Sequence, residues 1–184
     1  MILCMCSKAL DDHWMNKAAR VQARSLDGEQ AAHTHTHTHM LRLCAGLTPY
    51  IHCELLFPET DGSSYSITAN TQKIHKVSSK QFARDEWEFL DLHLPDNTVY
   101  NMQLFANQKH AQQCGFNWVG FSSAGVWPVS GGGRKYFCSE FVCEALQQGG
   151  LLAGVRPASM TPARLYAKIR PLPQVSGDLY FNVL

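Results

Sequence analysis

The sequence predicts an α+β fold, and three observations indicate it. Residues 50–57 alternate in the way expected of a strand with one face in a core. A turn at 58–62 and further extended segments follow, so a sheet forms before the main helices. Residues 98–113 and 138–148 then repeat apolar side chains at helical spacing. Strands followed by helices are typical of the α+β class.

The strand expected over 50–57 has two faces of different chemistry, and it follows an extended segment at 41–43 and a turn at 46–49. One face carries Ile51, Cys53, Leu55 and Phe57, and the other carries His52, Glu54 and Leu56. A hairpin turn with Asp61-Gly62 then leads to extended segments at 65–69, 74–77 and 86–94. A change of phase in the last of these predicts a bulge near Phe89-Leu90.

The second half of the chain is predicted to be mainly helical. Pro95-Asp96-Asn97 caps a helix over 98–113, which Gly115 ends. The aromatic and Gly-rich stretch 116–135 is expected to be a long loop. The helix over 138–148 stops at Gly149-Gly150, Thr161-Pro162 begins a short helix, and 179–183 is expected to be a strand.

Length and charge narrow the classes of function. The chain has 184 residues, which fits one domain with an appendage. A net charge of +1, with Lys and Arg scattered, argues against a nucleic-acid partner. No apolar run could span a bilayer, and the apolar start at 1–6 is too short for a signal peptide. We therefore expect a cytoplasmic protein, of a cell or of a virion, whose oligomeric state stays open.

Residues 1–39 differ from the rest of the chain in composition and in sequence pattern. His33–His39 alternates strictly with Thr, and on an extended backbone its four imidazoles would share one face, as in a transition-metal site. A low-complexity linker is the preferred interpretation, because a CA repeat in DNA encodes alternating His and Thr. We therefore predict a dispensable, low-complexity or disordered extension at 1–39 and a globular domain at 40–184, with no metal site and no cofactor.

The cysteines are expected to be free thiols. Their number, seven, is odd, and no Cys-x-x-Cys pair of the zinc-binding kind is present. Without an export signal, a reducing compartment is the expectation. The cysteines are Cys4, Cys6, Cys44, Cys53, Cys114, Cys138 and Cys143.

Cys138 is the candidate nucleophile. It begins a predicted helix directly after the Gly-rich segment 131–133. The unpaired N–H groups and the positive dipole at a helix start both favour thiolate, the reactive form of cysteine. A buried structural cysteine is the alternative interpretation, and it is the preferred one for Cys143.

His52 is the candidate base for that nucleophile. It shares its face of the predicted strand with Glu54, and a polar pair on a buried strand needs partners. A third group usually orients the imidazole, and Glu54 and Ser66 are the two candidates. The backbone N–H of Cys138 is expected to stabilise the oxyanion, with Tyr136 or Asn117 as a further donor.

Four segments together resemble a known family. They are His52-Cys53-Glu54-Leu55, Asp61-Gly62, Gly115-Phe116-Asn117 and Phe137-Cys138-Ser139-Glu140-Phe141-Val142. They look like the circularly permuted papain-fold hydrolases of the NlpC-like superfamily, in the branch with lecithin–retinol acyltransferase-like proteins. The resemblance covers 41–170, and similar small members occur in large DNA viruses and bacteria.

This resemblance implies an antiparallel sheet packed against the helix that carries the nucleophile. It also implies Cys138 as nucleophile and His52 as base, with histidine before cysteine in the chain. The third polar position would fall near Ser66, where several relatives have histidine or another strongly polar residue. The chemistry that it implies passes through an acyl-enzyme and includes amide and thioester hydrolysis and acyl transfer between lipids.

The leading hypothesis is a cysteine peptidase or amidase that cleaves a peptide, another amide or an ester. A lipid acyltransferase or phospholipase of the same fold is the first alternative. It would contact a membrane surface through the segment 116–130, whose apolar residues are Phe116, Trp118, Val119, Phe121 and Trp127. A catalytically inactive binding module is the second alternative.

Overall fold

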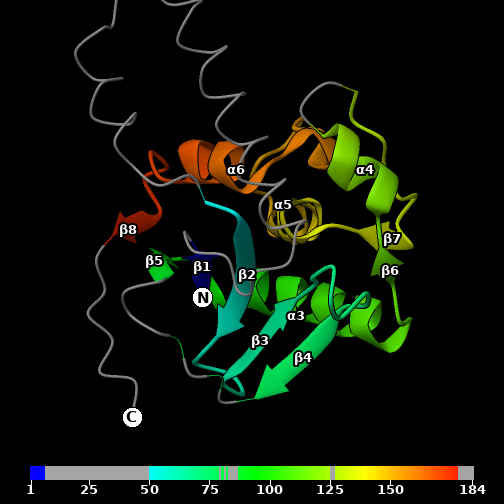
Figure 1. Cartoon of the computed structure of the whole chain (residues 1–184). Coiled ribbons are helices and arrows are strands. Elements are labelled where there is room, and N and C mark those ends of the chain that lie inside the picture. The colour runs from blue at the N-terminus through cyan, green and yellow to red at the C-terminus, as the bar shows by residue number, and fades with distance from the viewer. Residues whose placement is uncertain (7–49, 79, 81, 83–86, 125–126, 178–184) are drawn as a thin grey trace, which may run out of the picture.

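The computed structural model describes residues 1–6, 50–78, 80, 82, 87–124 and 127–177. Its strands are β1 Ile2–Cys6, β2 His52–Phe57, β3 Ser63–Ser66, β4 His75–Ser78, β5 Trp87–Leu92, β6 Gly115–Phe116, β7 Lys135–Tyr136 and β8 Val175–Gly177. Its helices are α3 Asp96–Ala111, α4 Trp118–Ser123, α5 Cys138–Gln148 and α6 Pro162–Ile169, with a 3-10 turn at Pro157–Ser159. Figure 1 shows the sheet with the helices gathered on one side, which confirms the α+β class.

Six strands form one antiparallel sheet in the order β4-β3-β2-β1-β5-β8. The hairpin between β2 and β3 closes at Gly62, whose φ of 63° favours a residue without a Cβ, and the Gly62 N–H donates to the Phe57 carbonyl at 3.0 Å. The second sheet is a short parallel pair, β6 and β7.

The first residues of the chain lie at the centre of the six-stranded sheet. β1 pairs with β2 on one side and with β5 on the other, and Met5 is fully buried. We expected a low-complexity or disordered extension at 1–39, whereas residues 2–6 form a paired strand. The alternation in 1–6 is too short to show its long-range partners. The His-Thr repeat, the segments at 41–43 and 46–49 and the strand expected at 179–183 lie outside the described residues.

The two faces of the sheet are covered differently. The face that includes Cys53, Leu55 and Phe57 packs against α3 and α5 and forms the main core. On the opposite face Leu56 and Trp87 form a smaller cluster with Phe82 and Phe89. Both faces of β5 carry buried apolar side chains. The change of phase in its apolar pattern therefore reflects burial on both faces and requires no bulge. The register from Ile2↔Asp91 to Cys6↔Trp87 is continuous, so the predicted bulge is absent.

The stretch predicted as a loop contains structure that its sequence does not reveal. Asn117 caps α4 by accepting from the Gly120 N–H at 2.9 Å, and β6 and β7 pair although residues 117–134 separate them. Two-residue strands carry too little pattern to be predicted. The helices α3, α5 and α6 lie within about two residues of the predicted bounds.

The central position of β1 predicts that a chain starting at Met40 will not fold. Its loss exposes the unpaired edges of β2 and β5 and removes Met5 from the core. We expect loss of the cooperative thermal transition and accumulation in the insoluble fraction. The control keeps 1–6 and replaces His33, His35, His37 and His39 with serine. A cooperative transition in the truncated chain equal to that of the control would contradict the placement of β1.

Candidate active site

The first turn of α5 packs against the beginning of β2. Helix α5 begins at Cys138, with Phe137 as its N-cap, so its first N–H groups have no acceptor within the helix. β2 begins at His52, and α5 contacts this strand. The structure thus brings together the two residues that the sequence analysis singled out, although 85 positions separate them in the chain.

Glu140 determines where α5 begins. It occupies the third helical position, and its carboxylate accepts a hydrogen bond from the backbone of Phe137, as in a capping box. It also accepts from the Gly131 N–H at 3.3 Å and from Asn117 Nδ2 at 3.0 Å. A Cβ on Gly131 would lie 1.9 Å from the Lys135 carbonyl oxygen, so the close approach of this loop requires glycine.

The Cys138 thiol lies beside both Cys53 and His52. Side-chain hydrogen bonding with Cys53 lowers the pKa of Cys138 most, burial opposes this, and hydrogen bonding and charge interaction with His52 lower it further. The pKa therefore lies well below its ordinary value. Of the two partners, His52 can carry the compensating positive charge, which favours a thiolate–imidazolium pair. Both Cys138 and His52 are 6% exposed.

The pKa values of Cys53, Cys114 and Cys143 shift in the opposite direction. Burial and hydrogen bonding with Cys138 raise the pKa of Cys53, and burial raises that of Cys114. Burial, followed by the charge of Glu144, raises the pKa of Cys143 to about 12. Of these four thiols, Cys138 is therefore the one whose pKa is lowered, which favours the reactive thiolate form.

Glu54 is held close to the imidazole. His52 Nε2 lies 4.0 Å from Glu54 Oε2, and among the described residues neither atom has a hydrogen-bond partner. The other carboxylate oxygen, Oε1, pairs with Lys80 Nζ at 2.6 Å. Lys80 also lies over the rings of Phe82 and Trp87, and Trp87 meets the His52 ring edge-on at 5.9 Å between centroids.

Ser66 lies next to Glu54 rather than behind the imidazole. It follows Tyr65, the register partner of Leu55, so it falls on the same face of the sheet as Glu54. Its own partner on β4 is His75, whose pKa is lowered, mainly by burial. Of the two candidates for a third group, Glu54 therefore has the measured proximity to His52.

Two side chains expected as oxyanion donors have other partners. The Tyr136 hydroxyl donates to Glu144 Oε1 at 3.0 Å, two helical turns along α5 from Cys138. Asn117 Nδ2 donates both to the Val129 carbonyl at 2.9 Å and to Glu140. A Cβ on Gly120 would lie 2.2 Å from Asn117 Nδ2, which shows how closely α4 encloses this amide. Both residues hold the loop and α5 together through these bonds, and the donor role expected of each stays a prediction.

The residues that connect the start of β2 to α6 were not predicted from the sequence. Glu88 on β5 accepts hydrogen bonds from Tyr50 and from Tyr166, the latter at 2.6 Å, and the two tyrosine rings lie 4.6 Å apart between centroids at a tilt of 40°. Tyr50 precedes His52 by two residues, so this cluster ties the start of β2 to α6. Its members lie far apart in the chain, and no local pattern connects them. Glu140, by contrast, was recognisable as the acidic residue at the third position of a helix.

Within the described ranges, no group of three or more His, Cys, Asp or Glu residues is arranged to hold a metal ion. Over the same residues, no helix is long and apolar enough to cross a bilayer. Comparison of the chain with protein-family models, curated proteins and solved structures found no match.

The lowered pKa of Cys138 predicts a characteristic pH dependence of alkylation. Because thiolate is the reactive form, a lowered pKa keeps Cys138 reactive well below the ordinary thiol pKa of about 8.5. We expect the pH midpoint of iodoacetamide labelling to lie below that value in the native protein and to rise in His52→Ala. Labelling is measured residue by residue with peptide mass spectrometry, with Cys143 as the unreactive internal control. A midpoint that His52→Ala leaves unchanged would argue against the imidazole as the cause.

Proposed function

We propose that the protein is a cysteine hydrolase that cleaves an amide or ester bond through an acyl-enzyme on Cys138. The single observation that carries this proposal is the meeting of a buried thiol at a helix start with a strand histidine, which together with Cys53, the larger cause, lowers the pKa of the thiol. Structural cysteines in apolar surroundings shift the other way, as Cys143 does.

The geometry supports a role for each group in the reaction. The Cys138 thiolate attacks the substrate carbonyl, and N–H groups at the start of α5 lie where they can stabilise the oxyanion. The imidazolium of His52 then protonates the leaving amine or alcohol. The same imidazole next takes a proton from water, which attacks the thioester, releases the acid and restores the thiolate–imidazolium pair.

Glu54 is the third group in this proposal. Its Oε2 atom needs to move only about 1 Å from its 4.0 Å separation to accept a hydrogen bond from His52 Nε2–H. Such a bond would select the tautomer whose Nδ1 serves Cys138 and would stabilise the imidazolium. Lys80 holds the other carboxylate oxygen, so it acts on the reaction by positioning Glu54.

The fold is consistent with the permuted papain-like family that the motifs resemble, and we include this family in the proposal. The strand with histidine precedes the helix with cysteine, and an antiparallel sheet packs against that helix. β1 is the part of this arrangement that lies outside the range 41–170 on which the resemblance rests.

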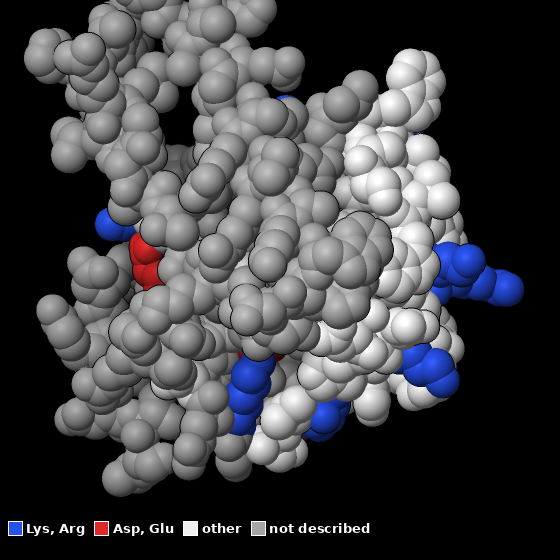
Figure 2. Space-filling view, in the orientation of Figure 1, with Lys and Arg blue, Asp and Glu red and all other residues white. Residues whose placement is uncertain are grey.

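A second function, on lipid esters, is favoured by the surface near α4. Trp118, Val119 and Trp127 are 40%, 63% and 77% exposed. In Figure 2 the surface over α4 is largely free of charge, with Lys and Arg at its margin. Exposed Trp side chains beside basic residues are typical of proteins that insert into the interface of a membrane. A phospholipase or acyltransferase would use the same Cys138 and His52.

Removal of the nucleophile tests the proposed function. We expect Cys138→Ala to lose turnover while its thermal transition persists, and His52→Ala to lose about a hundred- to ten-thousandfold. Hydrolysis is measured on a panel of acyl amides, thioesters and phospholipids with a chromogenic or fluorescent leaving group. Mass spectrometry of the native protein should trap an acyl group on Cys138. Cys143→Ala is the matched control and should keep its activity.

Unchanged turnover in Cys138→Ala would reject a cysteine hydrolase. Absence of turnover and of acylation across the whole panel, in a folded native protein, would favour a binding module instead. A preference for phospholipids over amides would select the lipid alternative.

The exposed apolar side chains near α4 predict binding to vesicles. A fully buried large apolar side chain contributes about 1.5–3 kcal/mol, so losing two should reduce binding at least tenfold. We expect the protein to sediment with vesicles of phosphatidylcholine and phosphatidylserine, and Trp118→Ser with Trp127→Ser to remain in the supernatant. Tyr100→Ser with Leu104→Ser, on exposed positions of α3, is the control. Equal sedimentation of both double variants would show that the apolar side chains near α4 do not mediate membrane contact.

A further inference from the structure

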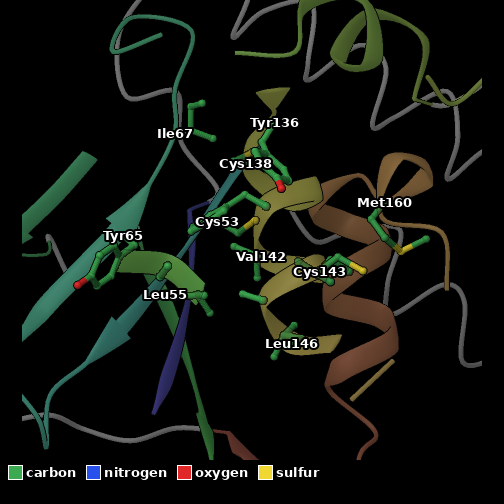
Figure 3. Packing of buried hydrophobic residues seen from close by; sticks show 14 of the residues in the cluster. Cys53, Leu55, Tyr65, Ile67, Tyr136, Cys138, Val142, Cys143, Leu146 and Met160 are labelled. Atoms are coloured by element: carbon green, nitrogen blue, oxygen red, sulfur yellow. The ribbon is translucent and has the colours of Figure 1, made fainter. Parts of the chain in front are cut away.

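Two thiols meet at the junction of β2 and α5. Cys53, the second residue of β2, is fully buried, and Cys138, the first residue of α5, is 6% exposed. Figure 3 shows both side chains in the space between the strand and the helix. Both are free thiols, and Cys53 lies close enough to Cys138 for its side chain and backbone to lower the pKa of the Cys138 thiol.

We propose that Cys53 and Cys138 form a reversible disulfide under oxidation by a peroxide, with Cys53 as the resolving thiol. The bond would convert the nucleophile into an unreactive sulfur, so hydrolysis would stop until a thiol reductant restores it. This consequence for turnover rests on the proposed function, whereas formation of the bond does not.

The position of the two side chains suits this bond. The strand and helix that carry the two thiols are in contact, and both side chains occupy the space between them, so the sulfurs need only a short approach to reach the S–S length of about 2 Å. Cys114 and Cys143 have different surroundings. Cys114 hydrogen-bonds to the Gly133 carbonyl at 3.8 Å, and Figure 3 shows Cys143 further along α5, near Met160.

The chemistry proceeds in two balanced steps. The Cys138 thiolate attacks one oxygen of hydrogen peroxide, the O–O bond breaks, and the released hydroxide takes a proton to give water and Cys138 sulfenic acid. The Cys53 sulfur then attacks the sulfenic sulfur, the S–O bond breaks, and the hydroxide leaves with the Cys53 proton as a second water. Two thiols are oxidised by two electrons, and one peroxide is reduced to two waters.

The difference in burial assigns the order of these steps. Peroxide reacts with a thiolate that it can reach, and Cys138 is both the thiolate and the more exposed of the pair. Cys53 is sealed from solvent, so it reacts only with the sulfur that it touches. A resolving thiol in contact with a sulfenic acid competes with further oxidation to the irreversible sulfinic acid.

The test treats the folded, full-length protein with a small excess of hydrogen peroxide and maps its cysteines by non-reducing peptide mass spectrometry. We expect the main product to be a Cys53–Cys138 linkage, seen as the loss of two hydrogens, which dithiothreitol reverses. Sulfinic acid on Cys138 with Cys53 still reduced, or a main linkage between other cysteines, would overturn the proposal.

Matched variants separate the role of Cys53 from general thiol oxidation. In Cys53→Ala, we expect Cys138 to gain oxygen atoms, to react with dimedone while it is a sulfenic acid and to resist recovery by dithiothreitol. In Cys143→Ala, which removes another buried thiol of α5, the Cys53–Cys138 linkage should form as in the native protein. A Cys53→Ala variant whose Cys138 recovers as fully as the native protein would show that Cys53 does not resolve it.

The mass measurement also distinguishes a failure of the disulfide proposal from a failure of the proposed hydrolase function. A protein without turnover on any substrate could still form the disulfide, because the mass measurement needs no catalysis. An active hydrolase whose Cys138 is oxidised without involving Cys53 would disprove the switch and leave the proposed function unchanged.

Discussion

The contact between the first turn of α5 and the first residues of β2 is the interaction on which the rest of the site depends. It places a thiol, an imidazole and a second thiol within hydrogen-bonding range in a region that is almost closed to solvent. In such surroundings an isolated charge is costly, whereas a thiolate beside an imidazolium is compensated. The contacts with Cys53 and His52 therefore favour the thiolate form of the buried Cys138.

Two sets of interactions hold the start of α5 and the start of β2 in place. On the helix side, Glu140 gathers hydrogen bonds from Phe137, Gly131 and Asn117, which joins the start of α5 to the loop before it. On the strand side, Glu88 joins Tyr50 to Tyr166 and so connects the beginning of β2 to α6. Both sets use a carboxylate as acceptor for several donors, which is an efficient way to fix the position of otherwise independent segments.

The sequence predicted the parts of the site that local patterns encode. Alternation identified β2 and the face shared by His52 and Glu54, and helical spacing after a Gly-rich segment identified α5 with Cys138 at its start. What it could not predict depends on partners far away in the chain. The pairing of β1 with β2 and β5 and the hydrogen bonds of Asn117 and Tyr136 exist only in the folded chain. Side-chain type alone suggested Asn117 and Tyr136 as oxyanion donors, because an amide or a hydroxyl serves structure and catalysis equally well.

The place of β1 in the sheet also has a consequence for biosynthesis. This strand leaves the ribosome before both of its neighbours, which are complete only when synthesis reaches Phe57 and then Leu92. The nascent chain must therefore keep an apolar segment unpaired while nearly half of the protein is translated, and closing so long a loop delays sheet formation. A chaperone that shelters the emerging N-terminal segment would be most useful during this interval.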